Sequence, residues 1–239
     1  MEITNFDLGK EGKPHHHWLL PSSIRCVICG PSGCGKTNLM LNLLLNKGYL
    51  NFDCLHLYSR SLGQEKYQFL RDWAAALEHA APHAAPQHGA RADGGEVASF
   101  HSSSDDIIPV ESLDKEKRSI MVFDDVMLEN QTPIEKYFCQ GRHGGADCFY
   151  LTQSYFRIPK QAIRDNCNLL ILFNQDAKNV RTIHDTFVGG DMPFAEFREF
   201  CQWCWDESYG FCVIDLTSKP YNGRYRCGFD LFYIPRASI

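Results

Sequence analysis

The sequence lacks the features of membrane-spanning and exported proteins. No apolar run among its 239 residues approaches the roughly 20 that a membrane-spanning helix needs, so we expect no such helix. The opening stretch, MEITNFDLGKEGKP, is polar and charged, so we expect no signal peptide and an intracellular rather than a secreted protein. No internal repeat is visible, and solenoid or propeller architectures are therefore not indicated.

An excess of positive charge is also missing. Lys and Arg number 24 against 29 Asp and Glu, which gives a net charge of −5 and a pI near 6.0. Such a chain has no bulk attraction to nucleic acid, so any DNA contact must come from a local basic patch or from an oligomeric ring. Two basic groups are candidates for phosphate contacts, namely Arg157, Lys160 and Arg164, and Lys219, Arg224 and Arg226.

Cysteine, in contrast, is abundant, with eleven residues. Reduced thiols are expected, because the chain is long and shows no export signal. Cys26 and Cys29 fall in an expected strand, where positions three apart face opposite sides and cannot share a metal ion. Cys201 and Cys204 share one face of an expected helix, but no second pair with zinc-ligand spacing is evident, so core packing is favoured for them too.

Apolar strands alternate with amphipathic helices along the chain. Several strands are apolar throughout rather than at alternate positions, which indicates a mostly parallel sheet covered by helices on both faces, an α/β fold. Strands are expected at 24–29, 52–59, 97–101, 119–123, 148–151, 169–173, 210–216 and 225–229. Helices are expected at 38–45, 64–77, 131–140, 159–166, 176–188 and 193–206.

The composition predicts one large domain with two appendages. Residues 1–21 form an expected N-terminal arm, and residues 22–239 form the domain, whose 44% apolar content is enough for a core of its own. Residues 78–106 are rich in Ala, His, Pro and Gly and then in Ser and Asp, which predicts a flexible surface insertion.

A glycine-rich turn between the first strand and its helix carries the strongest chemical signal. Residues 30–37, GPSGCGKT, match G-x-x-x-x-G-K-[ST] without a mismatch, and the flanking strand and helix are the context that this P-loop requires. Its backbone N–H groups and the helix N-terminus are suited to phosphate. Lys36 can reach the β- and γ-phosphate oxygens, and the Thr37 hydroxyl can ligate Mg²⁺. The predicted ATP-binding residues are Gly30, Pro31, Ser32, Gly33, Cys34, Gly35, Lys36, Thr37 and Asn38.

An acidic pair follows a second apolar strand at Ile120–Asp125. Open α/β sheets bind ligands at the carboxyl ends of their strands, so Asp124 is the expected Mg²⁺ partner, acting through water. Asp125 comes one residue later, where a carboxylate can orient or deprotonate the attacking water. Thr152 and Gln153 end the next apolar strand, and the Gln153 amide is expected to contact the γ-phosphate.

This order of elements is that of the additional-strand class of P-loop ATPases, which usually form rings with active sites between subunits. Such a site needs a cation from the neighbouring subunit to neutralise charge on the γ-phosphate. Arg142, in the Gly-rich turn GRHGG, is the favoured candidate, with Arg157 and Arg164 as alternatives.

The segments GPSGCGKTNLM, SIMVFDDV, GRHGG and YLTQSYFRIPKQAIRDNCNLLILF resemble the poxvirus-type genome-packaging ATPases of the FtsK–HerA superfamily. Relatives of these proteins occur in large DNA viruses and self-synthesising DNA transposons, and the resemblance covers roughly residues 22–230. It implies a RecA-like sheet of strand order 5-1-4-3-2 with extra C-terminal strands. It also implies a homo-oligomeric ring, a pentamer or hexamer, around double-stranded DNA. The implied activity is ATP-driven DNA translocation into a capsid, with a capsid portal or a membrane-associated capsid component as a further partner.

Two features depart from that family pattern. Asp125 stands where the superfamily often has the longer Glu, and the Ala/His/Pro-rich stretch 78–95 is unlike a compact connection. Two other interpretations stay open: a P-loop kinase acting on a small molecule, and a nucleotide-binding relative that does not hydrolyse.

Overall fold

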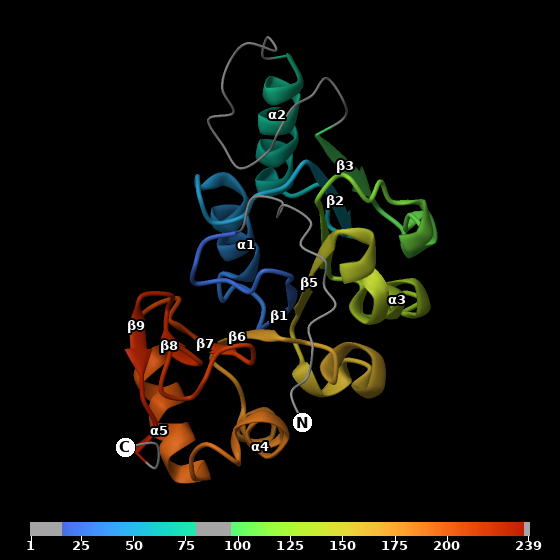
Figure 1. Ribbon diagram of the computed structural model, residues 1–239. Helices are drawn as coiled ribbons and strands as arrows, with labels where there is room; N and C mark the ends of the chain where they lie inside the picture. The colour runs from blue at the N-terminus through green and yellow to red at the C-terminus, as the bar shows by residue number, and fades with distance from the viewer. Residues whose placement is uncertain (1–15, 80–96, 237–239) are drawn as a thin grey trace.

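Nine strands within residues 16–79 and 97–236, the part of the chain that this computed structural model describes, form a single sheet (Figure 1). Its spatial order is β3-β2-β4-β5-β1-β6-β7-β8-β9. The strands are β1 (Arg25–Cys29), β2 (Cys54–Ser59), β3 (Ala98–His101), β4 (Ser119–Asp124), β5 (Ala146–Thr152), β6 (Leu169–Phe173), β7 (Phe211–Asp215), β8 (Tyr225–Cys227) and β9 (Leu231–Tyr233).

The centre of the sheet has the expected topology. The strands from β3 to β6 in the spatial order all pair in parallel, whereas β7, β8 and β9 are antiparallel additions at one edge. When β1, β2, β4, β5 and β6 are counted as the first to fifth core strands, their order is 5-1-4-3-2. The predicted RecA-like core and the extra C-terminal strands are therefore confirmed.

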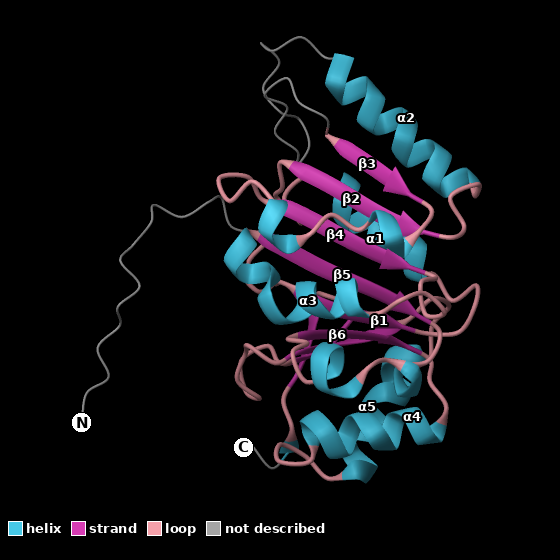
Figure 2. Cartoon of the chain, turned by 90° about the vertical axis from the view of Figure 1, so that its right-hand side faces the viewer, coloured by secondary structure: helices cyan, strands magenta, loops and turns pink. Residues whose placement is uncertain are grey.

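Helices cover both faces of this sheet (Figure 2). They are α1 (Lys36–Leu45), α2 (Glu65–His79), α3 (Thr132–Gln140), α4 (Ala177–Ile183) and α5 (Phe194–Trp205). Buried residues of α1 and α2 pack on one face, and those of α3, α4 and α5 pack on the other. No helix within the described ranges is long and apolar enough to cross a membrane.

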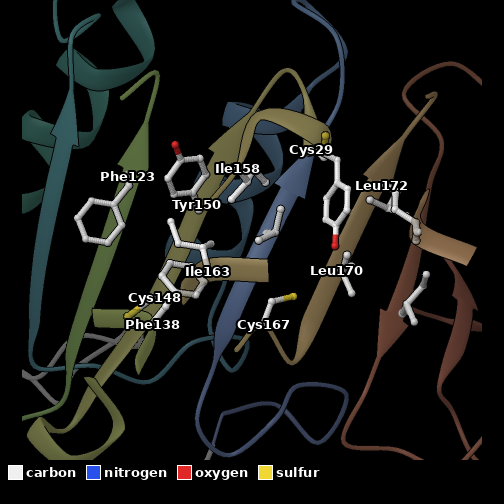
Figure 3. Close-up of a cluster of buried hydrophobic side chains, with 14 of the residues drawn as sticks. Cys29, Phe123, Phe138, Cys148, Tyr150, Ile158, Ile163, Cys167, Leu170 and Leu172 are labelled. Atoms are coloured by element: carbon white, nitrogen blue, oxygen red, sulfur yellow. The ribbon is translucent and has the colours of Figure 1, made fainter. Parts of the chain in front are cut away.

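The two cores explain why the central strands are apolar throughout. In β1, Cys26 and Ile28 belong to the core under α1 and α2, whereas Val27 and Cys29 belong to the opposite core. Figure 3 shows part of that second core, where Phe123 of β4 and Tyr150 of β5 lie in one layer with Ile163. Successive side chains of a strand point to opposite faces, so both faces need apolar residues here. The expectation that Cys26 and Cys29 lie on opposite sides is confirmed.

The main local differences from the expected elements occur in the second half of the chain. The strand expected at 225–229 ends at Cys227, because the chain turns at Gly228, with φ at +60°, and returns as the unanticipated β9. The helix expected at 159–166 is a single π-helical turn, Lys160–Arg164. The helix expected at 176–188 is α4 followed by another such turn, His184–Val188.

The expected arm and insertion are only partly described. Residues 1–15 and 80–96 lie outside the described ranges. His16 is buried, and its Nε2 lies 2.9 Å from Asp147 Oδ2 and 2.9 Å from Arg118 Nη1, so the end of the arm is anchored to the domain. At the end of the predicted insertion, Ala98–His101 forms β3, which pairs with β2 at the sheet edge.

The parallel register places the predicted motifs at one edge of the sheet. Cys29, which precedes the P-loop, pairs with Thr152, and Asp124 pairs with Ser59 on one side and Leu151 on the other. Since the carboxyl ends of parallel strands meet at the same edge, the P-loop, the acidic pair and Gln153 become neighbours despite their separation in sequence.

Candidate nucleotide-binding site

The P-loop connects β1 to α1 through two glycines with left-handed backbone. Gly33 has φ at +75° and Gly35 has φ at +110°, conformations that side chains disfavour. Gly35 is also the N-cap residue of α1, and no described side chain caps that helix. The first-turn N–H groups of α1 are therefore available to an anion.

Lys36 points back into the loop. Its Nζ donates to the carbonyl oxygens of Gly30 at 2.7 Å and Pro31 at 2.8 Å. These contacts keep the ammonium group beside the N–H groups of the loop, where it can meet the same anion.

Asp124 is the buried member of the acidic pair, with 8% of its surface exposed. Burial raises the pKa of this carboxyl group, while hydrogen bonding from Tyr67 and the charge of Lys36 oppose the increase. Thr37 Oγ1 donates to Asp124 Oδ2 at 3.4 Å, and the Tyr67 hydroxyl donates to the same oxygen. With its proton directed at Asp124, the Thr37 oxygen has lone pairs free for a cation.

Asp125 differs from Asp124 in exposure and in backbone geometry. Its side chain is exposed, its φ is +56°, and its Oδ2 accepts a hydrogen bond from Ser61 Oγ at 3.1 Å. Asp tolerates the left-handed region better than most residues, but the conformation still stores strain, which is typical of active sites. Its direct contact with solvent suits a group that must meet water.

These groups border one cleft of about 680 Å³. Gln153 also borders the cleft, as does Arg157, which the sequence indicated only as an alternative to Arg142. The predicted residues lining the cleft are Ser32, Gly33, Gly35, Lys36, Thr37, Asn38, Asp124, Asp125 and Gln153. One carboxylate and one hydroxyl beside a phosphate site are a donor set that fits Mg²⁺, which usually takes few protein ligands together with phosphate oxygens.

A second cleft of about 340 Å³ lies on the other side of the P-loop. It is lined by Cys34, Phe173, Asn174, Trp205, Glu207, Ser208, Tyr209 and Gly210. Tyr209 borders both clefts, and a Cβ placed on Gly35 would lie 3.3 Å from its ring. The motifs did not identify this cleft. The signal that could have found it is topological, because β6 pairs with β1 and so brings Phe173 beside the P-loop.

Four predicted site residues do not line the larger cleft, namely Gly30, Pro31, Cys34 and Arg142, and Cys34 lines the smaller cleft instead. Arg142 is the member of this set that lies outside the P-loop. It is exposed, and it lies in the turn Gly141–Gly144 that leads into the start of β5, whereas Gln153 follows the end of that strand. A strand of this length spans about 20 Å, so Arg142 lies at the opposite edge of the sheet from its own P-loop. A role in a neighbouring subunit stays a prediction.

Two of the three residues in the C-terminal basic group, Arg224 and Arg226, form contacts inside the domain, whereas Lys219 is exposed. Arg226 is 2% exposed, donates to the carbonyl oxygen of Leu19 at 2.6 Å and lies 3.6 Å from Asp215. Arg224 donates to Asp191 at 2.6 Å. The expectation of a phosphate contact at Arg226 is therefore wrong, because its charge is used inside the domain.

Four cysteines gather where α5 packs on the antiparallel strands. Cys201 and Cys204 lie in the same core as Cys212, and Cys227 pairs with Cys212 across β7 and β8. Sequence spacing missed Cys212 and Cys227 as neighbours of the helical pair. Burial raises the pKa of Cys227 to about 12 and also raises that of Cys212, so these thiols stay protonated. Within the described ranges, no group of three or more His, Cys, Asp or Glu could hold a metal ion.

Comparison with known proteins agrees with this geometry. No protein-family model and no curated protein matches the sequence. Among solved structures, the genome packaging NTPase B204 from Sulfolobus turreted icosahedral virus 2 in complex with AMP matches at a TM-score of 0.53 and 13% identity. That match covers 86% of this chain and 96% of B204.

Two further structures support the same likeness. The B204 complex with ATP-gammaS matches at a TM-score of 0.53 and 12% identity, over 86% of this chain and 96% of B204. B204, the DNA-packaging ATPase from Sulfolobus turreted icosahedral virus, matches at 0.50 and 12% identity, over 84% and 95% of the two chains. At these identities the likeness is one of fold, and the chain has the fold of a viral genome-packaging P-loop NTPase.

Proposed function

We propose that this chain is an ATP-hydrolysing motor that moves double-stranded DNA into a viral or virus-like capsid. The observation that carries the proposal is the convergence of Lys36, Asp124 and Asp125 on one cleft, in a sheet with the fold of a packaging NTPase. The triphosphate would lie along the P-loop, with its γ-phosphate toward Gln153 and its base in the smaller cleft beside Tyr209.

Each side chain has a distinct task in this proposal. Lys36 and the N–H groups of α1 neutralise the phosphate oxygens, and Asp125 orients and deprotonates the attacking water. Thr37 and Asp124 would hold Mg²⁺, which supplies further neutralisation of charge on the phosphates. Gln153 would contact the γ-phosphate and respond to its loss.

A ring of identical subunits would complete the site. Arg142 lies before β5, at the end of the parallel strands opposite to the chain's own cleft. In a ring, this residue would therefore act on the nucleotide of a neighbour. Arg157, in contrast, borders the cleft of its own chain and is exposed, so it can approach bound phosphate or DNA.

The test is the rate of ATP hydrolysis with and without double-stranded DNA, for the wild-type chain and two variants. DNA should stimulate the wild type. Lys36→Ala should abolish turnover and weaken nucleotide binding. Asp125→Asn should still bind Mg²⁺ and nucleotide but lose about 100-fold or more in kcat, the usual contribution of a general base.

Three other outcomes would oppose the proposal. Turnover that depends on a small-molecule acceptor would identify a kinase. Nucleotide binding without turnover in the assembled oligomer would identify a non-hydrolysing relative. A hydrolysis rate that does not change with DNA would support ATPase activity but contradict the role in DNA translocation.

A further inference from the structure

Tyr67 is a buried tyrosine whose hydroxyl lies inside the acidic site. It comes from the first turns of α2, 1% of its surface is exposed, and its ring packs in the core shared by α1 and α2. The motifs of the sequence did not point to it. Its hydroxyl donates to Asp124 Oδ2, the same oxygen that accepts from Thr37 Oγ1 at 3.4 Å.

Two donors on one oxygen restrict the orientation of the Asp124 carboxylate. Thr37 belongs to α1 and moves with the P-loop, whereas Tyr67 belongs to α2, so the carboxylate is held from two independent elements. The other carboxylate oxygen and the lone pairs of Thr37 are then left for a cation and its water. A hydrogen bond that orients a metal ligand typically affects metal affinity strongly without touching the metal itself.

The segment that contains Tyr67 also forms a hydrogen bond to Asp125. Ser61 lies just before α2, and its Oγ donates to Asp125 Oδ2 at 3.1 Å. One residue earlier, Arg60 forms an ion pair with Glu129, which follows the acidic pair in sequence. Three contacts therefore join the segment Arg60–Tyr67 to the end of β4 and the loop that follows it, and two of them end on the acidic side chains.

We propose that Tyr67 and Ser61 are positioning residues, Tyr67 orienting Asp124 for Mg²⁺ and Ser61 orienting Asp125 for water. This inference rests on the proposed ATP hydrolysis. The two residues have separable effects, because Asp124 serves cation binding whereas Asp125 serves the chemical step. Loss of the Tyr67 hydroxyl should change the need for Mg²⁺, and loss of the Ser61 hydroxyl should change kcat.

The experiment compares Tyr67→Phe and Ser61→Ala with Tyr137→Phe in the full chain. Tyr137 is the matched control, because it is equally buried at 1% exposure and donates its hydroxyl to the Ile108 carbonyl oxygen at 2.5 Å, away from the acids. The first readout is binding of a non-hydrolysable ATP analogue, measured by calorimetry in EDTA and across a Mg²⁺ titration. The second is the separate determination of kcat and KM.

Tyr67→Phe should bind the analogue like the wild type in EDTA, because its hydroxyl donates to Asp124, whose proposed task is to hold the cation and not the phosphates. The Mg²⁺ concentration for half-maximal tight binding should rise about tenfold or more. Ser61→Ala should leave that concentration unchanged and lower kcat about tenfold, a modest part of what a general base supplies. Tyr137→Phe should match the wild type in both readouts.

An unchanged Mg²⁺ titration for Tyr67→Phe would overturn the assignment of Tyr67, and an unchanged kcat for Ser61→Ala would overturn that of Ser61. Failure of Tyr67→Phe to fold, judged by circular dichroism, would also overturn its assignment, since a hydroxyl that only orients Asp124 is dispensable for folding. A wild-type chain without Mg²⁺-dependent binding or turnover would instead refute the proposed function itself, and the positioning roles with it.

Discussion

Tyr209 is placed where it could contact the base of a nucleotide bound at the P-loop. It is 69% exposed, holds φ at +63° and borders both clefts beside the P-loop. A tyrosine in the left-handed region is strained, and such strain is commonly retained where a side chain must be aimed. Tyr209 lines the larger cleft and also the smaller one, whose lining includes the aromatic residues Phe173 and Trp205.

We predict that Tyr209→Ala weakens ATP binding by a factor of roughly 3 to 10, the worth of one aromatic contact. Binding of inorganic tripolyphosphate should not change, because that ligand has no base to stack. Tyr209→Phe should keep wild-type affinity, and Tyr221→Ala, which removes another exposed tyrosine, should have no effect. Equal losses for ATP and tripolyphosphate would place Tyr209 in the phosphate site instead.

At the scale of elements, the C-terminal strands are tied to the segment before β1 through Arg226. The guanidinium group of Arg226, on β8, donates to the Leu19 carbonyl oxygen and lies 3.6 Å from Asp215, at the end of β7. The side chains of Arg226 and Asp215 are 2% and 6% exposed. A charged pair at this depth is costly to break, because the remaining charge stays buried without its partner.

Arg226→Met should therefore lower the free energy of unfolding by about 3 kcal/mol or more, because it leaves Asp215 unneutralised. Urea unfolding measures this as a lower midpoint at an unchanged m-value. The matched variant is Arg236→Met, since Arg236 pairs with Glu199 at side-chain exposures of 74% and 58%. An exposed pair is worth at most about 1 kcal/mol, so comparable losses in the two variants would contradict the structural role of Arg226.

At the scale of the whole molecule, two of the three candidate arginines, Arg142 and Arg157, lie at opposite ends of the parallel strands. Arg157 borders the nucleotide cleft of its own chain, whereas Arg142 precedes β5 at the edge where the parallel strands begin. In the proposed ring, Arg157 would therefore contact the nucleotide of its own chain and Arg142 the nucleotide of a neighbour.

Mixing experiments separate these roles. Arg142→Ala and Lys36→Ala chains should each be inactive, but their mixture should regain turnover, because the Lys36→Ala subunit supplies Arg142 to an intact P-loop next to it. A mixture of Arg157→Ala with Lys36→Ala chains should stay inactive. Each subunit then has a defect in its own cleft, and a neighbour cannot replace the missing side chain. Absence of recovery in the first mixture, with oligomers present by light scattering, would remove Arg142 as the neighbour's cation.

The sequence by itself predicted the P-loop, the acidic pair and, through the family resemblance, the order of the five central strands. The P-loop is a local structure whose glycines and Lys36 act within eight consecutive residues, so spacing is enough to predict it. Asp124 and Gln153 follow apolar strands, and the rule that strands of a parallel sheet end at one edge places them beside the P-loop.

The tertiary structure alone decided which other side chains reach those groups. Tyr67 contacts Asp124 across 57 residues of sequence, and Ser61 contacts Asp125 across 64, so no local pattern could reveal either contact. Likewise, the sequence predicted Arg226 as a phosphate-contacting charge, whereas in the folded sheet its partners are Asp215 and the Leu19 carbonyl oxygen. The physical reason is the same in each case: burial and hydrogen-bond partners depend on packing between elements, which spacing along the chain does not encode.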